Sequence, residues 1–529
     1  MITLGIEGTS HTVGAGIVRD NTILSSITHV YAPKRGGIQP REAANHHFDH
    51  IKEVVDEAFR VASVVPGDID LVSFSRGPGL GPCLRVAATA ARSISLKFRK
   101  PIVGVNHAMG HLEVARAASG FADPAVLYVS GGNTQVIMHS QGFYRVFGET
   151  MDIGLGNMLD KLARGMGYAF PGGPVIERLA SDGENLLDLP YSVKGMDTAF
   201  SGILTAAQKH IMDGKSKEDV SYSVQETTFS MVLECLERGL KHMSRDEIIL
   251  TGGVAINKRF REMFSNLGKS LGIRYYAAEP QHCGDNGAMI AIAGSLIYRS
   301  SGPDKLEDTW VNQRFRIDEV PAPWIEERWN PNSSMEGAEA RLTEEIFRGR
   351  RALRKQRLAK SYRIPELDNE IRKARLLQEF QVIHALDRAG IRVPIVYGID
   401  PGSNSLIVEH IVGKQLRDIS RTAAFPDILQ SLLPIVNRMH RCNISHGDLT
   451  LSNIMISRNG ELVLIDPSMG TMDATDEDKA VDLFLLEESM RSSGIPDPES
   501  IEAIYNKLES GNSSVIEKLN LLKKRRRYV

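Results

Sequence analysis

A β-rich stretch that ends in small, hydrogen-bonding residues occurs three times in the first half of the chain. The three stretches are 2–18, 125–138 with its Ser-Gly-Gly-Asn-Thr turn, and 248–257 with its Thr-Gly-Gly turn. Glycines let backbone N–H groups close on an anion, and hydroxyl and amide side chains add hydrogen bonds. One such turn is weak, but three in one domain predict a two-lobed nucleotide-binding fold with an internally duplicated core.

Helical patterns lie between these stretches, which indicates the α/β class. They are expected at about 41–63, 82–98, 155–166, 174–181 and 223–241. With 529 residues the chain is too long for one ordinary core. We predict a first domain at 1–325, a linker at 326–336 and a second domain at 337–529. Trp310 and Trp324 precede the joint, close to Trp329, and we expect both to pack on the first domain.

Composition excludes several classes of protein. No apolar run has membrane-spanning length, and the first residues lack the charged and apolar regions of a signal peptide. The four cysteines are scattered and form no CxxC pair, which disfavours a zinc ribbon and fits a reducing cytoplasm. The net charge of −2 gives no hint of nucleic acid, although the chain closes on the basic run Lys523–Arg527. Such a run is either a solvated terminus or a contact for phosphate backbones.

Two histidines stand four residues apart on a predicted helix. Asn106 is a suitable N-cap for this helix, and Gly120 a suitable stop. His107 and His111 therefore project from one face and can reach one metal ion. The same spacing is also found on ordinary polar helix faces, so the pair alone leaves both interpretations open.

Asp285 precedes a second, apolar helix near the end of the first domain. It either caps that helix or supplies the carboxylate that completes a two-histidine metal site with positions open for substrate. Asp160 and Glu177 lie on helices beside the glycine-rich loop 170–174. They are either acceptors for ribose hydroxyls or ordinary surface carboxylates.

Four motifs occur in order and span nearly the whole first domain. They are Asn-His-Ala-Met-Gly-His at 106–111, Ser-Gly-Gly-Asn-Thr at 130–134, Thr-Gly-Gly-Val-Ala-Ile-Asn at 251–257 and Cys-Gly-Asp-Asn-Gly-Ala-Met at 283–289. Together they resemble the universal tRNA threonylcarbamoyl transferase family, once labelled O-sialoglycoprotein endopeptidases. The loop 76–82 and the segment 316–320 resemble its archaeal and eukaryotic branch.

The resemblance implies an actin-like (ASKHA) ATPase fold and transfer of a threonylcarbamoyl group from threonylcarbamoyl-AMP. The acceptor is N6 of the adenosine 3′ to the anticodon in ANN-decoding tRNAs. It implies His107, His111 and Asp285 as metal ligands, with Tyr128 completing or adjoining the site. Iron(II) is favoured by the resemblance, and zinc also suits these ligand types. The implied nucleotide-pocket residues are Tyr128, Val129, Ser130, Gly131, Gly132, Asn133, Asp160, Gly173, Glu177 and Asn257.

The old peptidase label is a rival interpretation. Zincin proteases place a glutamate directly after the first histidine, as general base for the metal-bound water. Here Ala108 follows His107, and Glu113 lies two residues past His111, well around the helix. No base stands where that mechanism needs one, so the sequence disfavours peptidase activity.

The second domain carries the sequence His-Gly-Asp-Leu-Thr-Leu-Ser-Asn at 446–453. Its spacing matches a kinase catalytic loop, in which Asp448 orients the hydroxyl nucleophile and Asn453 holds Mg²⁺. Asp466 follows the predicted strand 462–465 and takes the place of the metal-binding aspartate. Asp466 is followed by Pro-Ser-Met-Gly, and Gly447 replaces the arginine that pairs with a phosphorylated activation loop, so that switch is absent.

These features, with the segment 478–483, resemble the small atypical kinase of the KEOPS complex, which is related to RIO kinases. Lys355 is the chosen ATP lysine and Glu379 its partner; Lys360 is the alternative. The resemblance implies ATP and Mg²⁺ as ligands, action as a kinase or an ATPase, and a basic tail that meets tRNA.

We therefore expect a bifunctional, cytoplasmic tRNA-modification protein that works with other KEOPS subunits and no membrane. Two alternatives are an actin-like signalling kinase whose first domain senses nucleotide, and a non-catalytic chaperone-like module. The second does not explain two histidines and an aspartate placed for a metal.

Overall fold

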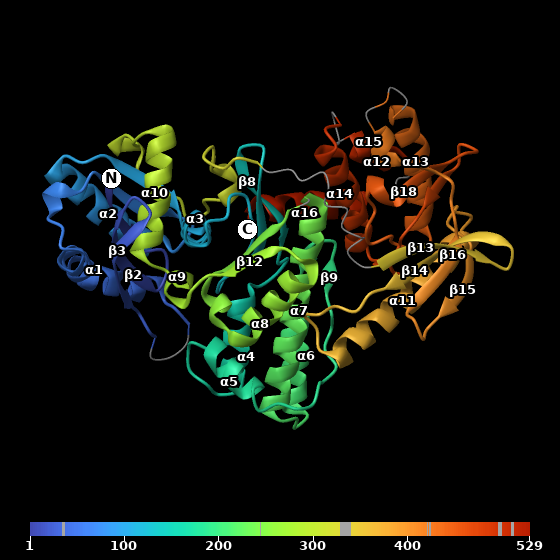
Figure 1. Cartoon of the computed structure of the whole chain (residues 1–529), viewed down its shortest axis with the longest axis horizontal. Coiled ribbons are helices and arrows are strands. Elements are labelled where there is room, and N and C mark those ends of the chain that lie inside the picture. The colour runs from blue at the N-terminus through green and yellow to red at the C-terminus, as the bar shows by residue number, and fades with distance from the viewer. Residues whose placement is uncertain are drawn as a thin grey trace. The chain divides into compact units, whose positions relative to one another are not determined.

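The computed structural model describes residues 1–33, 37–243, 245–327, 340–420, 422, 425–495, 500–508 and 513–528. Contacts between residues divide the chain into two compact units (Figure 1). One is Met1–Ser334 with Ser361–Arg363, and the other is Met335–Lys360 with Ile364–Val529. Most of the predicted linker, residues 328–336, lies outside the described residues, as does Trp329.

The first unit contains two five-stranded sheets. One consists of β1 (Ile2–Glu7), β2 (Thr12–Arg19), β3 (Thr22–Val30), β4 (Leu71–Gly77) and β5 (Ile102–Asn106). The other consists of β6 (Ala125–Val129), β7 (Thr134–Ser140), β8 (Phe143–Glu149), β11 (Glu247–Thr251) and β12 (Arg274–Ala277). The strand orders are β3-β2-β1-β4-β5 and β8-β7-β6-β11-β12, so the two lobes repeat one topology. The predicted two-lobed α/β fold with a duplicated core is confirmed.

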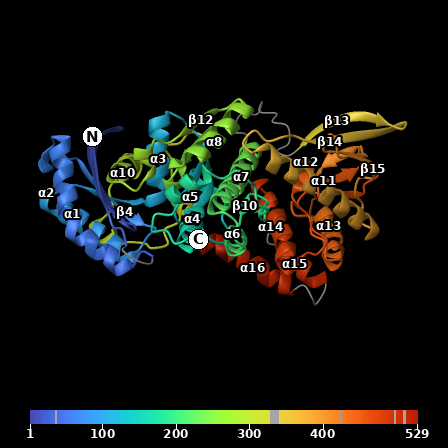
Figure 2. The same ribbon diagram turned by 90° about the horizontal axis from the view of Figure 1, so that it is seen from below.

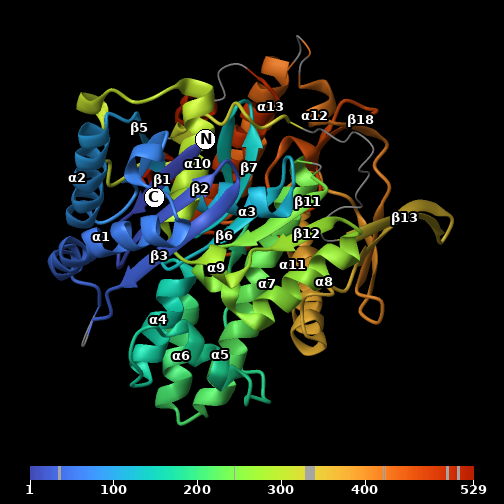
Figure 3. The same ribbon diagram turned by 60° about the vertical axis from the view of Figure 1, so that its left-hand side comes forward.

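Helices cover both sheets, and a short hairpin of β9 (Val193–Lys194) and β10 (Asp197–Thr198) adjoins β8. The helices are α1 (Pro40–Ala62), α2 (Gly81–Phe98), α3 (His107–Ser119), α4 (Leu155–Gly165), α5 (Gly173–Ala180), α6 (Ser201–Met212), α7 (Lys217–Met243), α8 (Lys258–Leu271), α9 (Pro280–Cys283) and α10 (Gly287–Ser301). The helices α1 and α2 pack against one face of the first sheet, and α10 packs against the other (Figure 3).

The two faces of the first sheet have different side chains because strand residues alternate between them. Leu4 and Ile6 point into the apolar core beneath α1 and α2. Gly5 and Gly16 face α10. A Cβ atom on Gly5 would lie 2.1 Å from Gly287 O, and one on Gly16 would lie 2.3 Å from Ala288 N. Glycine at these positions lets α10 lie directly on the sheet, and this fixes the position of the residues just before that helix.

The second unit combines a four-stranded antiparallel sheet, a three-stranded sheet and helices. The first sheet has the order β13 (Ala340–Phe347), β14 (Arg350–Arg357), β16 (Ser405–Glu409), β15 (Val396–Asp400), and the second β17 (Gly413–Gln415), β18 (Ile454–Ser457), β19 (Leu462–Leu464). The helices are α11 (Pro365–Arg388), α12 (Leu416–Ile419), α13 (Phe425–Arg441), α14 (Asp476–Ser492), α15 (Ser500–Leu508) and α16 (Ser513–Tyr528). The helices α13 to α16 gather around one apolar core (Figure 2). The predicted kinase-like α+β domain is confirmed.

Most predicted helices are confirmed to within one residue, namely α1, α2, α4 and α5. The predicted start of the next helix at 223 was wrong, because α7 begins at Lys217. Ser216 Oγ accepts a hydrogen bond from Asp219 N at 3.0 Å, so a serine cap followed by acidic residues starts the helix early.

The expectation for the tryptophans was half right. Trp324 packs on the first unit and donates its indole N–H to Glu113 Oε1 at 2.8 Å. Trp310 is 61% exposed, so its predicted packing was wrong. The buried neighbour Thr309 anchors this stretch instead, since Arg92 Nε donates to its hydroxyl at 2.8 Å. Among the described residues, no helix is both long enough and apolar enough to cross a bilayer.

Candidate metal and nucleotide sites

The first candidate site begins on α3. Asn106 ends β5 and caps the helix as predicted, its side chain accepting a hydrogen bond from Met109 N at 3.3 Å. His107 and His111 then lie one turn apart on the buried face, 7% and 1% exposed. Burial of both imidazoles excludes the alternative of a solvated polar helix face.

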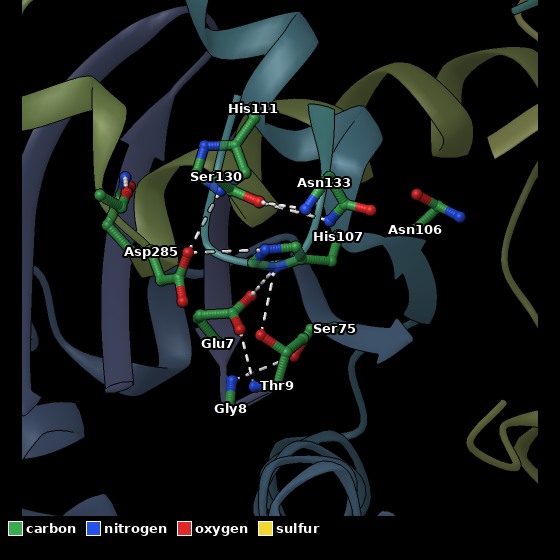
Figure 4. A network of polar contacts seen from close by, with 12 residues as sticks. Glu7, Gly8, Thr9, Ser75, Asn106, His107, His111, Ser130, Asn133 and Asp285 are labelled. Atoms are coloured by element: carbon green, nitrogen blue, oxygen red, sulfur yellow. Dashed lines mark hydrogen bonds and ion pairs between the residues drawn. The ribbon is translucent and has the colours of Figure 1, made fainter. Parts of the chain in front are cut away.

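Asp285 meets the two histidines from the other side of the site (Figure 4). Its Oδ1 atom lies 3.5 Å from His107 Nε2 and 3.2 Å from His111 Nε2. One ligand atom from each of the three residues falls within 4.8 Å of the others, which fits one metal ion. Asp285 does not cap α10, because Asn286 does so by accepting from Met289 N at 2.9 Å.

Glu7 was missed by the sequence analysis. It ends β1, is fully buried, and places Oε2 3.1 Å from His107 Nδ1. Its other oxygen accepts from Thr9 N at 2.7 Å, which fixes the carboxylate. A carboxylate on one ring nitrogen of a histidine orients the ring and leaves the other nitrogen for a metal. A charged residue at the end of an otherwise apolar strand was the available signal.

The charges around the histidines favour a cation. Burial opposes protonation of His107, but the carboxylates of Glu7 and Asp285 outweigh it and raise the pKa to about 9. Burial lowers the pKa of His111. Burial also disfavours the Asp285 carboxylate, yet the two histidines hold its pKa well below the usual range. The carboxylates of Glu7 and Asp285 therefore favour positive charge at this point.

Tyr128 is the penultimate residue of β6 and lies beside this cluster. Its ring centroid lies 5.2 Å from that of His111, and its hydroxyl is buried without a hydrogen-bond partner among the described residues. An unsatisfied buried hydroxyl is costly, so a ligand or ion at this point would satisfy it. Glu113, by contrast, accepts hydrogen bonds from Tyr144 Oη at 2.7 Å and from Trp324. Its structural role agrees with the absence of a peptidase base.

The loop 130–133 adjoins the histidines and follows Val129, the last residue of β6 (Figure 4). Ser130 N donates to Asn133 O at 2.8 Å, and Ser130 Oγ accepts from Asn133 N at 3.2 Å. The N–H groups of Gly131 and Gly132 have no hydrogen-bond partner among the described residues, and both glycines are exposed. This leaves two adjacent backbone donors for an anion.

The remaining predicted pocket residues are held by backbone hydrogen bonds. Asp160 Oδ1 accepts from Gly172 N at 2.6 Å, next to Gly173 at the start of α5. Burial raises the pKa of Asp160 despite this bond. Glu177 Oε1 accepts from Lys258 N at 2.8 Å, beside Asn257, which caps α8. Each carboxylate therefore accepts a hydrogen bond from a backbone N–H group of a neighbouring segment.

The second unit brings three predicted kinase residues together. Lys355 on β14 places Nζ 2.6 Å from Glu379 Oε1 on α11, and it also bonds Asp466. Burial opposes the charge of Lys355, but Asp466 and Glu379 outweigh it and raise its pKa. Arg357, which the sequence analysis missed, pairs with the other oxygen of Glu379. Lys360 lies beyond the end of β14.

Asp482, on α14, holds the start of the predicted catalytic loop by hydrogen bonds to its backbone. Its two carboxylate oxygens accept from the N–H groups of His446 and Gly447, each at 2.7 Å. Asn453 Nδ2 donates to Asp448 Oδ2 at 2.9 Å, so these two residues meet. Gly447 has φ +75°, and a Cβ atom there would lie 2.2 Å from Met469 O, so no arginine fits this position.

The basic tail is partly engaged within the second unit. Lys523, on α16, pairs with Glu487 at 2.5 Å and also with Glu502. Burial opposes its charge, but the hydrogen bonds to these glutamates outweigh it and raise its pKa. Lys523 therefore helps to hold the last helix in place.

Comparisons with known proteins cover both units. The family model for tRNA N6-adenosine threonylcarbamoyltransferase (TsaD) matches residues 22–292, and the model for the RIO domain matches residues 340–485. A probable bifunctional tRNA threonylcarbamoyladenosine biosynthesis protein of Thermoplasma volcanium is 51% identical over 93% of this chain and 92% of its own length. Its counterpart in Thermoplasma acidophilum is 48% identical over the full length of both chains. That of Methanothermobacter thermautotrophicus is 46% identical over 93% of each.

Proposed function

Because this chain belongs to the family of bifunctional tRNA threonylcarbamoyladenosine biosynthesis proteins, we propose residue roles for each of its two activities. The chain combines a tRNA N6-adenosine threonylcarbamoyltransferase domain with a RIO-type kinase domain. The predicted fusion and its tRNA-modifying function are thereby confirmed. The roles of individual residues, the metal, the donor and the partners make up the proposal.

We propose that His107, His111 and Asp285 hold one divalent metal, with Tyr128 beside it. The convergence of both Nε2 atoms on Asp285 Oδ1 supports this set. The unsatisfied Tyr128 hydroxyl supports it as well. Iron(II) is the favoured ion and zinc the alternative. When bound, such an ion acts as a Lewis acid toward the carbamoyl oxygen. Glu7 keeps the Nε2 lone pair of His107 available by accepting a hydrogen bond from Nδ1–H of that ring.

The donor is proposed to be threonylcarbamoyl-AMP, bound with its phosphate at the loop 130–133. The free N–H groups of Gly131 and Gly132 would bind the phosphate oxygens. Asp160 and Glu177 would offer their second oxygens to the ribose, near Gly173 and Asn257. In the transfer, N6 of the tRNA adenosine bonds to the carbamoyl carbon and the anhydride bond to AMP breaks. N6 loses one proton in this step, and AMP leaves with the electron pair of the broken bond.

In the second unit, Lys355 is proposed to bind the ATP phosphates while Glu379 holds it in place. Asp466 and Asn453 would bind Mg²⁺, and Asp448 would orient the attacking hydroxyl or water. The contacts among Lys355, Glu379 and Asp466 support these roles. We further propose ANN-decoding tRNA and the other KEOPS subunits as partners. A cytoplasmic location fits four cysteines that all stand as free thiols.

The observation that carries the proposal is the buried meeting of His107, His111 and Asp285 next to an open glycine loop. The test incubates the full chain with KEOPS partners, threonylcarbamoyl-AMP and ANN-decoding tRNA, followed by digestion to nucleosides. Wild type should form threonylcarbamoyladenosine, and the His107→Ala/His111→Ala variant should lose both the product and one metal equivalent.

His210→Ala serves as the matched control, because this histidine on α6 lies outside both clusters and bonds the backbone oxygen of Asp188 at 2.9 Å. It should retain product and metal. A double variant that keeps full transfer would refute the ligand assignment. Protein phosphorylation without any modified tRNA would favour the signalling-kinase alternative.

A further inference from the structure

A second histidine cluster lies on the first unit. His29 belongs to β3, while His46 and His50 belong to α1. One ligand nitrogen from each falls within 4.8 Å of the others. His29 Nδ1 and His46 Nε2 are 2.7 Å apart, and the ring centroids of His46 and His50 are 4.7 Å apart. These three histidines have no role in the threonylcarbamoyl transfer proposed above.

Local geometry explains why the three rings meet. His46 and His50 are separated by four residues, so they share one face of α1. That face packs against the first sheet, where β3 is the edge strand and His29 points toward the helix. All three side chains are only partly buried, so an ion from solvent can reach them.

We propose that His29, His46 and His50 form a second metal site, for a transition-metal cation such as Zn²⁺, that fastens α1 to the edge strand β3. Three imidazoles with a fourth position left to water make a common zinc ligand set. A set of nitrogen ligands selects zinc, nickel or copper over magnesium and calcium, which prefer oxygen. The site therefore differs in chemistry from the His107 site, which includes a carboxylate.

A carboxylate beside the cluster supports the assignment. Glu53 Oε2 lies 3.2 Å from His50 Nδ1, which leaves Nε2 of that ring for a metal. His46 Nδ1 is buried with no hydrogen-bond partner among the described residues, so hydrogen bonds within the cluster do not satisfy this ring. A network built only for hydrogen bonding would satisfy it.

Binding requires small side-chain movements. Nitrogens on a tetrahedral zinc ion, at bonds of 2.0–2.1 Å, stand about 3.3 Å apart. The hydrogen-bonded pair of His29 and His46 would therefore open slightly. The rings of His29 and His50 are stacked with centroids 3.7 Å apart, so one of them must rotate. Partial exposure of both rings permits this rotation.

The test counts zinc ions on the untagged full chain. The protein is stripped with a chelator and dialysed against Zn²⁺ alone, and bound metal is measured by elemental analysis. Wild type should bind two ions per chain, and His29→Asn or His50→Asn should each bind one. His111→Ala should also bind one, and His50→Asn/His111→Ala none. His210→Asn, the control outside both clusters, should bind two.

Two further measurements separate coordination from a structural effect. With Co²⁺ in place of Zn²⁺, the His111→Ala variant should show tetrahedral visible absorption that disappears in His50→Asn/His111→Ala. Glu53→Gln should weaken zinc binding roughly 10- to 100-fold without changing the number of sites. A wild-type chain that binds one ion, lost on His111→Ala, would overturn the proposal. So would a His50→Asn variant that still binds two.

Discussion

The two proposed active sites differ in whether their charged side chains are already paired with each other. In the first unit, His107, His111 and Asp285 turn toward one shared point, and Glu7 orients His107 from behind. In the second unit, Lys355 already bonds both Glu379 and Asp466. The first site is therefore arranged to receive a cation, whereas the second must exchange partners when Mg²⁺ and ATP bind.

The two sites also differ in the burial and the backbone conformation of their residues. His111 is 1% exposed and is held by a helix whose cap and stop are both in place. The Asp466 side chain is 38% exposed, and its backbone has φ +59°, in the left-handed region that aspartate and asparagine adopt more readily than most residues other than glycine. A preformed site suits a resident metal, and an accessible one suits a nucleotide that must enter and leave.

The largest expected effect separates the two chemistries. Asp448→Asn should lower ATP turnover by roughly 10²- to 10⁴-fold, the usual loss when a positioned base is removed. Asparagine keeps the shape of the loop because its oxygen can still accept from Asn453 Nδ2. Phosphate release from ATP is the measurement, and the metal content of the first unit should stay unchanged. Asp473→Asn, at an exposed position after the loop, should have no effect. Undiminished turnover in Asp448→Asn would move ATP use to the first unit.

A substitution at Glu379 removes the carboxylate that pairs with two cations of the second site. This carboxylate is 2% exposed and bonds both Lys355 and Arg357. Glu379→Leu should destabilise the second unit by about 3–5 kcal/mol, because it leaves buried cations without their partner. Lys355→Met is the matched comparison and should cost less, since Arg357 still pairs with Glu379. Hydrogen exchange of peptides from α11 and β14 reads the local stability. Equal losses in the two variants would contradict the proposed charge balance.

In the proposed metal site, Glu7 orients the ring of His107 for a cation. Glu7→Gln should weaken metal binding at the His107 site roughly 10- to 100-fold, as is typical for the loss of an outer-shell carboxylate. Affinity is measured by competition with a chelator in a His50→Asn background, so that only one site is counted. Glu57→Gln, which removes an exposed carboxylate that pairs with Arg60, should leave the affinity unchanged. A Glu7→Gln variant with normal affinity would show that the orientation of His107 does not depend on this residue.

The sequence predicted best what depends on short spacing. His107 and His111 share a helix face because they stand four residues apart, and Asp448 meets Asn453 within one loop. Glycine turns predicted the duplicated lobes because each turn follows its own strand. Lys355 and Glu379 were matched through the kinase resemblance, and their side chains are 2.6 Å apart.

Contacts between distant segments were harder to predict. Glu7 and His107 are 100 positions apart in the sequence. They meet because β4 pairs with both β1, which ends in Glu7, and β5, which leads into α3. The basic run 523–527 suggested either a solvated terminus or a nucleic-acid contact, and it did not reveal that two glutamates on other helices of the second unit pair with Lys523. Periodicity and local motifs carry no information about such partners, because tertiary packing brings them together.

The position of Asp285 rests on the same kind of distant packing, and Gly16→Ala tests it with the smallest expected effect. A Cβ atom at position 16 would lie 2.3 Å from Ala288 N, so the first turn of α10 must move away from the sheet. Overpacking of this kind costs about 1–3 kcal/mol. Because only the cap residue Asn286 separates Asp285 from that turn, metal affinity at the His107 site should fall with stability. Thermal unfolding and chelator competition measure the two effects. Gly67→Ala is the control, since a Cβ atom there meets nothing within 4 Å. A Gly16→Ala variant that loses stability but keeps full metal affinity would show that Asp285 is positioned by α3 rather than by α10.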